Sequence, residues 1–392
     1  MIHSKELQTP CYIIHRKELH QGIDLLKSSL QKEWNNYEIG YSFKTNSLPW
    51  VVEEMKKQGL CAEVVSEDEY RLALKHKFDK IIYNGPVKGK DTFLHAIQTG
   101  AVINLDAKRE LCWLEESGKT DVTVGLRVNF NLEELCCGET SAGEEGSRFG
   151  FSYETGEFEE ALKRLQNSNI QLSGLHLHTS SKTRSIKIYQ ALSQMACKLK
   201  REYDLKLSYI DLGGGYFGGM ENKPKFPDYM KCIGEELSKE FRPEETMLIV
   251  EPGTSLITPP VEYLTTVIDT KKTYAGYFAV TDGSRIDIDP LHGKSGYFHK
   301  ILYRDRQMRP EIERQVICGF TCMENDRLFA VEHEGELHPG DRISYQKVGG
   351  YTMCLTPLFI RYFPAVYVED EGEYRLVRQA WTVDEYSRGS IY

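Results

Sequence analysis

Between residues 39 and 251 the chain alternates short apolar runs with longer stretches in which apolar residues recur every three or four positions. The short runs are typical of buried strands and the longer stretches of amphipathic helices. The predicted strands are Ile39–Lys44, Ala62–Ser66, Lys80–Asn84, Val102–Asp106, Val122–Asn129, Leu172–Thr179, Leu207–Leu212 and Met247–Glu251. The predicted helices are Pro49–Gln58, Glu67–Lys75, Asp91–Thr99, Lys108–Ser117, Phe158–Asn167, Ile186–Tyr203 and Asp228–Phe241. Strands alternating with helices in this way over about 220 residues predict an α/β fold, a (β/α)8 TIM barrel, with a doubly wound open sheet as the alternative.

The pattern changes near Val261, where short runs of alternating apolar and polar residues begin. These predicted strands are Tyr263–Asp269, Tyr277–Thr281, Val316–Cys322, Leu328–Val331, Arg342–Val348 and Ala365–Val368. Such runs, separated by turn residues, indicate an all-β module. We therefore predict a barrel at residues 30–262 and a β domain made of residues 263–392 with the N-terminal strand of residues 1–29. The long connection between Asn129 and Leu172 is predicted to lie on the face of the barrel that carries the active site.

Composition and charge narrow the range of functions. The 392 residues are 40% hydrophobic and 27% charged, as in a soluble globular protein, and the net charge of −9 disfavours nucleic acid and anionic membranes as partners. No stretch approaches the ~20 apolar residues that span a bilayer, and the N-terminus has no signal-peptide pattern. The ten cysteines form no CxxC pair, and nothing completes a zinc site around Cys136 and Cys137. We expect reduced thiols, a cytoplasmic location and no bound metal.

Polar residues of several kinds stand where the predicted barrel strands end, which is where the catalytic groups of such a barrel lie. They are Lys44, Glu63 with Ser66, Asn84, Arg127, His178, Gly213–Gly215 and Glu251. A lysine with a buried stem has a lowered pKa and becomes a usable nucleophile, whereas a surface lysine does not. Three successive glycines leave backbone N–H groups free to approach a phosphate, although such a run can also be a plain flexible turn.

Two other candidates have competing interpretations. His176 and His178 share one face of their predicted strand, and a stacking or core histidine is favoured over a metal ligand. Glu251 precedes Pro252 and Gly253 at a strand-to-turn boundary, where an acid could keep a heteroaromatic nitrogen protonated or could be an ordinary turn residue.

Together these motifs resemble those of the ornithine/diaminopimelate decarboxylase group, within the alanine-racemase-type barrel family of pyridoxal-phosphate enzymes. Tyr41–Asn46 is similar to the lysine motif of that family, which implies that Lys44 forms the Schiff base with pyridoxal 5′-phosphate. Gly174–Ser181 resembles the strand whose histidine, here His178, stacks on the cofactor ring and whose serine, here Ser181, meets the phosphate.

The resemblance extends to the other strand ends. Asp211–Tyr216 is similar to the phosphate loop of the family, with Gly213, Gly214 and Gly215 as its glycines. Glu251 matches the glutamate that binds the pyridine nitrogen. Arg127 and Glu63 fall where the family places polar residues on the cofactor side.

The second domain carries two more motifs. Gly319–Asp326 resembles the segment whose cysteine, here Cys322, reaches into the active site of the partner subunit and donates a proton. Gly349–Tyr351 resembles the segment whose tyrosine, here Tyr351, contacts the phosphate. These motifs imply a homodimer with shared active sites.

The resemblance implies decarboxylation of an amino acid of the diamino acid or carboxy-polyamine type. A racemase or another lyase on the same scaffold is disfavoured by Cys322, and a non-catalytic binding relative is disfavoured by the intact Lys44 and Glu251. We further hypothesise that Arg148 of one copy forms an ion pair with Asp326 of the other.

Several departures from the family pattern bear on the substrate. Thr254 stands where the family usually has an arginine, and Met323 stands where diaminopimelate enzymes have an acid. Glu324 follows one place later, where strand alternation would point it elsewhere. Asp289-Pro290 replaces an arginine-proline, so the charge suits an amine instead of a carboxylate, although a solvated loop aspartate is an equal alternative. These departures argue against diaminopimelate itself and leave Asp289 and Glu324 as candidate substrate contacts.

Overall fold

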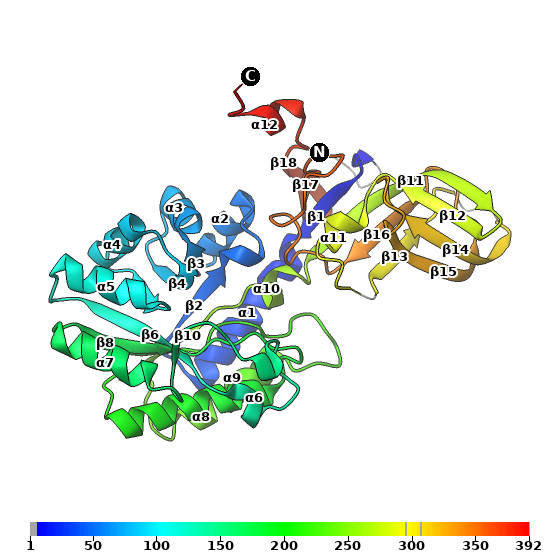
Figure 1. The fold of residues 1–392 in the computed structure, drawn as a ribbon. Helices are drawn as coiled ribbons and strands as arrows, with labels where there is room; N and C mark the ends of the chain where they lie inside the picture. Colours follow the sequence, from blue (N-terminus) through cyan, green and yellow to red (C-terminus); the bar gives the residue numbers. More distant parts are fainter. Residues whose placement is uncertain (1–5, 295, 306–307, 392) are drawn as a thin grey trace. The chain divides into compact units, whose positions relative to one another are not determined.

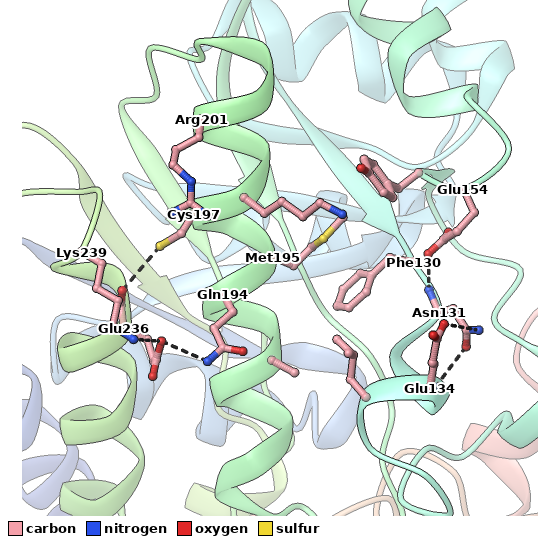
Figure 2. Close-up of a pocket in the computed structure, with 14 residues that line it drawn as sticks. Phe130, Asn131, Glu134, Glu154, Gln194, Met195, Cys197, Arg201, Glu236 and Lys239 are labelled. Atoms are coloured by element: carbon pink, nitrogen blue, oxygen red, sulfur yellow. Dashed lines mark hydrogen bonds and ion pairs between the residues drawn. The ribbon is translucent and has the colours of Figure 1, made fainter.

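The computed structural model describes residues 6–294, 296–305 and 308–391. The chain divides into two compact units (Figure 1): a barrel unit of residues 22–255, and a β unit formed by the residues up to 21 together with residues 256–392. The predicted domain ranges, 30–262 and 1–29 with 263–392, stay a prediction, because compactness does not measure independent folding. Within the described residues, no helix is long and apolar enough to cross a membrane.

Eight parallel strands of the barrel unit close on themselves. They are β2 Tyr37–Ser42, β3 Cys61–Ser66, β4 Ile81–Val87, β5 Val102–Leu105, β6 Thr123–Asn129, β8 Gln171–His176, β9 Tyr209–Asp211 and β10 Met247–Val250. Consecutive strands of this series pair side by side, β10 pairs with β2, and β5 pairs with both β4 and β6. The predicted (β/α)8 barrel is confirmed, and the open sheet is excluded because each of these strands has a neighbour on both sides.

Helices connect the strands on the outside of the barrel. They are α1 Arg16–Glu33, α2 Pro49–Lys57, α3 Glu67–Lys75, α4 Lys90–Gln98, α5 Lys108–Ser117, α7 Glu157–Asn167, α8 Ile186–Tyr203 and α9 Phe226–Leu237. Each presents an apolar stripe to the strands; in α7 the stripe consists of Phe158, Ala161, Leu162 and Leu165, which are all buried. The short helix α10, Thr254–Ile257, follows β10.

The connection between β6 and β8 contains the short helix α6 Leu132–Leu135, the 3₁₀ turn Gly143–Glu145 and the two-residue strand β7 Phe151–Ser152. Its middle lies against the segment that follows β8, because Ser141 N–H donates to the Ser180 carbonyl at 3.0 Å and Thr140 forms an isolated bridge with Ser181. The connection therefore lies at the C-terminal ends of the strands, as predicted.

The β unit is a mixed sheet in the order β15-β14-β12-β11-β1-β17-β18, with β16 pairing to β11 and β13. Its strands are β1 Cys11–His15, β11 Val261–Thr273, β12 Gly276–Thr281, β13 Phe298–Leu302, β14 Glu311–Cys318, β15 Arg327–Gly335, β16 Arg342–Gln346, β17 Ala365–Asp370 and β18 Glu373–Arg378. Two short helices, α11 Arg285–Ile288 and α12 Val383–Ser387, complete it. The sequence missed β13 and β18, which each pair with a single partner strand and are largely exposed, so they carry little apolar signal.

The prediction that one strand runs from Val316 to Cys322 is wrong. Strand β14 ends at Cys318, and a turn follows in which Cys322 is exposed. The turn forms because Asp326 accepts hydrogen bonds from the backbone N–H and the hydroxyl of Thr321, at 3.1 and 2.6 Å. The argument from strand alternation about Glu324 therefore does not apply, because this residue lies in the turn.

Candidate active site

Lys44 lies at the C-terminal end of β2, in the 3₁₀ turn Phe43–Thr45. Its Nζ donates to Glu63 Oε2 at 3.1 Å, and the Ser42 hydroxyl donates to the same oxygen at 2.5 Å. The Glu63 side chain is 1% exposed whereas that of Lys44 is 36% exposed. The amine is thus held by a buried carboxylate, and the side chain that carries it is partly exposed.

A chain of hydrogen bonds leads from Glu63 across the barrel interior. Asn84 Nδ2 donates to Glu63 Oε1 at 3.2 Å and to Glu251 Oε1 at 2.5 Å. Asn104 Nδ2 donates to Asn84 Oδ1 at 2.8 Å and to Asp211 Oδ2 at 3.1 Å. The amides of Asn84 and Asn104 therefore fix the relative positions of three buried carboxyl groups from strands β3, β9 and the end of β10.

Glu251 lies beside two groups that favour their neutral forms. One potential ligand atom from each of His176, Asp211 and Glu251 lies within 4.8 Å of the others. Burial, and then the charge of Glu251, raises the pKa of the Asp211 carboxyl well above its usual range. Burial, and then the charge of Arg127, lowers the pKa of His176 well below its usual value, and neither ring nitrogen has a hydrogen-bond partner. These ligand types also suit a metal ion, so the predicted absence of a metal stays a prediction.

His178 and the glycine loop meet directly after β8 and β9. The ring of His178, which lies two residues beyond the end of β8, is parallel to that of His176, with centroids 6.1 Å apart. Gly214 N–H donates to His178 Nδ1 at 3.3 Å, and a Cβ on Gly213 would lie 2.4 Å from the same nitrogen. A Cβ on Gly214 would lie 2.1 Å from the Glu251 carbonyl, so both positions need glycine. Burial, followed by the charge of Arg127, holds the pKa of His178 well below its usual value, which leaves a neutral flat ring.

Arg127 and Ser181 act on the backbone around His178. Arg127 donates to Asp106 Oδ2 at 2.6 Å and to the His178 carbonyl at 3.1 Å. Ser181 Oγ accepts the Arg184 N–H at 2.8 Å, which still leaves the hydroxyl proton for another partner.

The remaining predicted site residues belong to the β unit. Cys322 is exposed in the turn after β14, and Tyr351 is 40% exposed with a left-handed backbone (φ 56°). The Glu324 side chain is 99% exposed and lies 3.5 Å from Arg327. The structure brings Lys44, Glu63 and Glu251 into one network of the barrel unit. Cys322, Tyr351 and Glu324 belong to the β unit.

Two acidic residues of the β unit have structural partners. The Asp289 carboxylate accepts hydrogen bonds from Nε and Nη2 of Arg285, from the Tyr297 hydroxyl and from the backbone N–H groups of Gly293 and Lys294. It is 4% exposed, so the alternative of a solvated loop aspartate is wrong, and a substrate amine would have to displace these donors.

Asp326 is still more enclosed. At 2% exposure its carboxylate accepts Ser284 Oγ and Arg285 N–H, each at 2.9 Å, in addition to the two bonds from Thr321. The hypothesis of an ion pair with Arg148 of a second copy stays a prediction, and it would have to form beside four donors that this carboxylate already has within its own chain.

The sequence missed three residues of the site. Asn104 and Tyr209 are buried on the strands, and the Tyr209 hydroxyl donates to Asn104 Oδ1 at 2.8 Å. Glu69 lies near Lys44 and Glu63, and burial raises the pKa of its carboxyl to about 7. The one available signal was an asparagine inside the apolar run Val102–Leu105, since an unpaired amide there would be costly.

Comparison with protein families identifies the barrel. Residues 21–258 match the family described as pyridoxal-dependent decarboxylase, pyridoxal binding domain. The chain belongs to this family. The predictions of pyridoxal phosphate as cofactor and of a pyridoxal-dependent amino-acid decarboxylase are thereby confirmed.

Relatives of this pyridoxal-dependent decarboxylase extend over both units. It is 24% identical to a diaminopimelate decarboxylase from Methanothermobacter thermautotrophicus, over 98% of this chain and 92% of that protein. It is also 24% identical to the L-glutamyl-[BtrI acyl-carrier protein] decarboxylase of Niallia circulans, over 97% of this chain and 94% of that one. The crystal structure of diaminopimelate decarboxylase from M. jannaschii superimposes with a TM-score of 0.87 at 21% identity, covering 99% and 93% of the two chains.

The barrel residues fit the cofactor of the family. Lys44, whose side chain is partly exposed, provides an amine for the aldehyde of the cofactor, and Glu251 provides a buried carboxyl group for its pyridine nitrogen. The loop proposed for the phosphate has no room for a Cβ at Gly213 or Gly214. The buried hydroxyl of Tyr216, which directly follows this loop in the sequence, and that of Ser255 in α10 lack hydrogen-bond partners and remain available as donors.

Proposed function

We propose that this pyridoxal-dependent decarboxylase acts on a diamino acid or carboxy-polyamine, as a cytoplasmic homodimer with shared active sites. The observation that carries the proposal is the hydrogen-bonded path from Lys44 through Glu63 and Asn84 to Glu251. It places the amine and the acid that this chemistry requires on one rigid frame of parallel strands.

Each barrel residue has a role that its surroundings support. Lys44 Nζ is the amine that holds the cofactor, and Glu63 orients it. Glu251 keeps the proton on the pyridine nitrogen, helped by the neutral environment that Asp211 and His176 provide. His178 has a flat neutral ring that can stack on the cofactor. Arg127 positions this ring by donating a hydrogen bond to the backbone carbonyl of His178.

Residues outside this frame complete the site. Gly213, Gly214, Gly215, Ser181 and Tyr351 are proposed to bind the phosphate. When bound, pyridoxal phosphate accepts into its ring the electron pair left by departing carbon dioxide. Cys322 of the partner subunit then supplies a proton from Sγ to the Cα of the product, a general-acid role for which its exposure is suited.

The substrate class follows from the distal contacts. The curated relative from Methanothermobacter acts on diaminopimelate, whereas this chain has Thr254, Met323 and Asp289 at three positions that depart from the pattern of such enzymes. The Niallia relative is named for a glutamyl group on an acyl-carrier protein. A substrate with an ordinary α-amino and α-carboxyl end and a distal group other than that of diaminopimelate fits these departures best.

Two measurements test the activity. Carbon dioxide release across a panel of diaminopimelate, diamino acids, carboxy-polyamines and carrier-bound glutamate should identify at least one substrate other than diaminopimelate. Racemisation without carbon dioxide release would favour the racemase alternative, and binding without turnover would favour a non-catalytic relative. Borohydride reduction followed by peptide mass analysis should place the cofactor on Lys44, and the Lys44→Ala variant should lack this adduct.

Mixing two inactive variants tests the shared site. Lys44→Ala and Cys322→Ala each disable both sites of a homodimer, but a mixed dimer has one site with both residues intact. Random exchange of subunits should then restore about 25% of wild-type activity, because half of the dimers are mixed and each has one working site. No recovery after exchange, shown to occur with tagged subunits, would contradict the shared site.

A further inference from the structure

The glycine loop of the barrel unit has two cationic side chains beside it. Phe217 follows Gly215 by two residues, and its ring lies 5.5 Å from the Arg184 guanidinium carbon and 5.3 Å from Lys223 Nζ. Lys223 is exposed, whereas Arg184 is partly buried. Within the described residues, the Arg184 guanidinium has neither a hydrogen bond nor a carboxylate at ion-pair distance. A partly buried arginine without an anionic partner therefore lies over the ring of Phe217, two residues beyond the loop that is proposed to bind a phosphate.

The backbone of Arg184 is tied to the same loop. The Tyr229 hydroxyl donates to the Arg184 carbonyl at 2.6 Å and accepts the Phe217 N–H at 3.4 Å. Ser181 Oγ accepts the Arg184 N–H, which fixes a left-handed backbone with φ 51°. A residue other than glycine is uncommon in this conformation, so the local structure holds the arginine in place at some cost.

The charge of Arg184 reaches the phenols that contact the loop. Tyr189 donates its hydroxyl to the Gly214 carbonyl at 2.9 Å. Burial raises the pKa values of Tyr189 and Tyr229, and the positive charge of Arg184 opposes the rise at both phenols. Its charge therefore acts at two phenols, one bonded to Gly214 and the other to Phe217.

We propose that Arg184 binds the phosphate of pyridoxal phosphate and supplies the positive charge that is absent at Thr254. This inference rests on the assignment of the glycine loop as the phosphate site. A guanidinium provides a planar pair of donors that suits phosphate oxygens, and a neutral threonine provides neither the charge nor the pair. The family pattern has the cation in the segment after β10, whereas this chain has it in the segment after β8. In both cases the cation would bind the same phosphate.

The test compares two ligands that differ only in the phosphate. Binding of pyridoxal phosphate and of pyridoxal to the cofactor-free protein is measured by calorimetry for wild type, Arg184→Gln and Arg184→Gly. Both variants should bind pyridoxal phosphate about 10- to 100-fold more weakly, as expected for the loss of charge-assisted hydrogen bonds. Their affinity for pyridoxal should change less than about 2-fold, because pyridoxal offers no phosphate to the arginine. Arg184→Gly suits the left-handed backbone and guards against a folding defect.

Two further variants make the result specific. Lys223→Gln removes the other cation over the Phe217 ring and should leave both affinities nearly unchanged. Adding Thr254→Arg to Arg184→Gln should restore much of the affinity for pyridoxal phosphate. Equal losses for both ligands, or no loss for either, would overturn the role of Arg184 while leaving the cofactor assignment intact. Failure of the wild-type protein to bind pyridoxal phosphate at all would overturn the cofactor assignment itself.

Discussion

Buried acids occur in both units of this protein, but their hydrogen-bond donors differ. In the barrel unit, Glu63 and Glu251 accept hydrogen bonds from side chains, namely those of Ser42, Lys44 and Asn84. In the β unit, the carboxylates of Asp289 and Asp326 also accept hydrogen bonds from backbone N–H groups of tight loops, in addition to side-chain donors.

The difference separates acids that serve a ligand from acids that organise a loop. A side-chain donor can be exchanged for a ligand atom without disturbing the fold, whereas a backbone N–H that loses its buried acceptor destabilises the segment that carries it. The same residue type therefore has a chemical role at the C-terminal ends of barrel strands and a structural role in the loops at Asp289 and Asp326. Mutations can test whether each of these acids affects activity or stability.

The largest effect on activity is expected for Glu251→Gln. Glutamine can still accept the hydrogen bond from Asn84, so the barrel should unfold at nearly the wild-type urea concentration. It cannot keep the pyridine nitrogen protonated, and kcat should fall about 10²- to 10³-fold, as for the loss of one preorganised electrostatic contact. Steady-state kinetics and urea unfolding are the measurements. A variant with nearly wild-type kcat would place Glu251 with the structural acids.

The largest effect on stability is expected for Asp326→Ala. Four donors lose their acceptor, two of them backbone N–H groups, and the free energy of unfolding should fall by about 3 kcal/mol or more. Asp269→Ala is the matched control, because that side chain is 57% exposed, and its effect should stay below about 0.5 kcal/mol. Unchanged stability combined with dissociation of a dimer would instead support the ion pair with Arg148.

The barrel could be predicted from the sequence because its strands are buried on both faces and form nearly continuous apolar runs. The strand ends could be predicted as a site because parallel strands bring their C-terminal ends to one rim. Asn104 and Tyr209 were missed because their partners lie on other strands, distant in sequence. For Asp289 and Asp326, the number of backbone donors that converge on a carboxylate cannot be deduced from residue types alone.

A smaller loss of stability is expected for Asp289→Asn. The amide oxygen can still accept some of the backbone bonds, but the charge opposite Arg285 is lost, so the free energy of unfolding should fall by about 1–2 kcal/mol. The KM for the preferred substrate should be unchanged if this carboxylate serves the loop. A KM raised about 10-fold without a loss of stability would restore Asp289 as a substrate contact.

The smallest effect concerns Glu69, which combines both kinds of partner: its carboxylate accepts the Val65 N–H at 2.8 Å and lies near Glu63 and Lys44. Burial raises the pKa of Glu69 from its ordinary value of 4.5 to about 7, so the folded protein binds the proton more tightly than the unfolded chain does. The stabilisation is fully present below pH 4.5 and is lost as the pH rises to about 7. Partial exposure reduces the expected change to about 1 kcal/mol. Urea unfolding of wild type and Glu69→Gln should be measured at several pH values. The difference between their free energies of unfolding should change between pH 4.5 and about 7 and be constant above pH 7. A difference that does not change with pH would contradict the raised pKa.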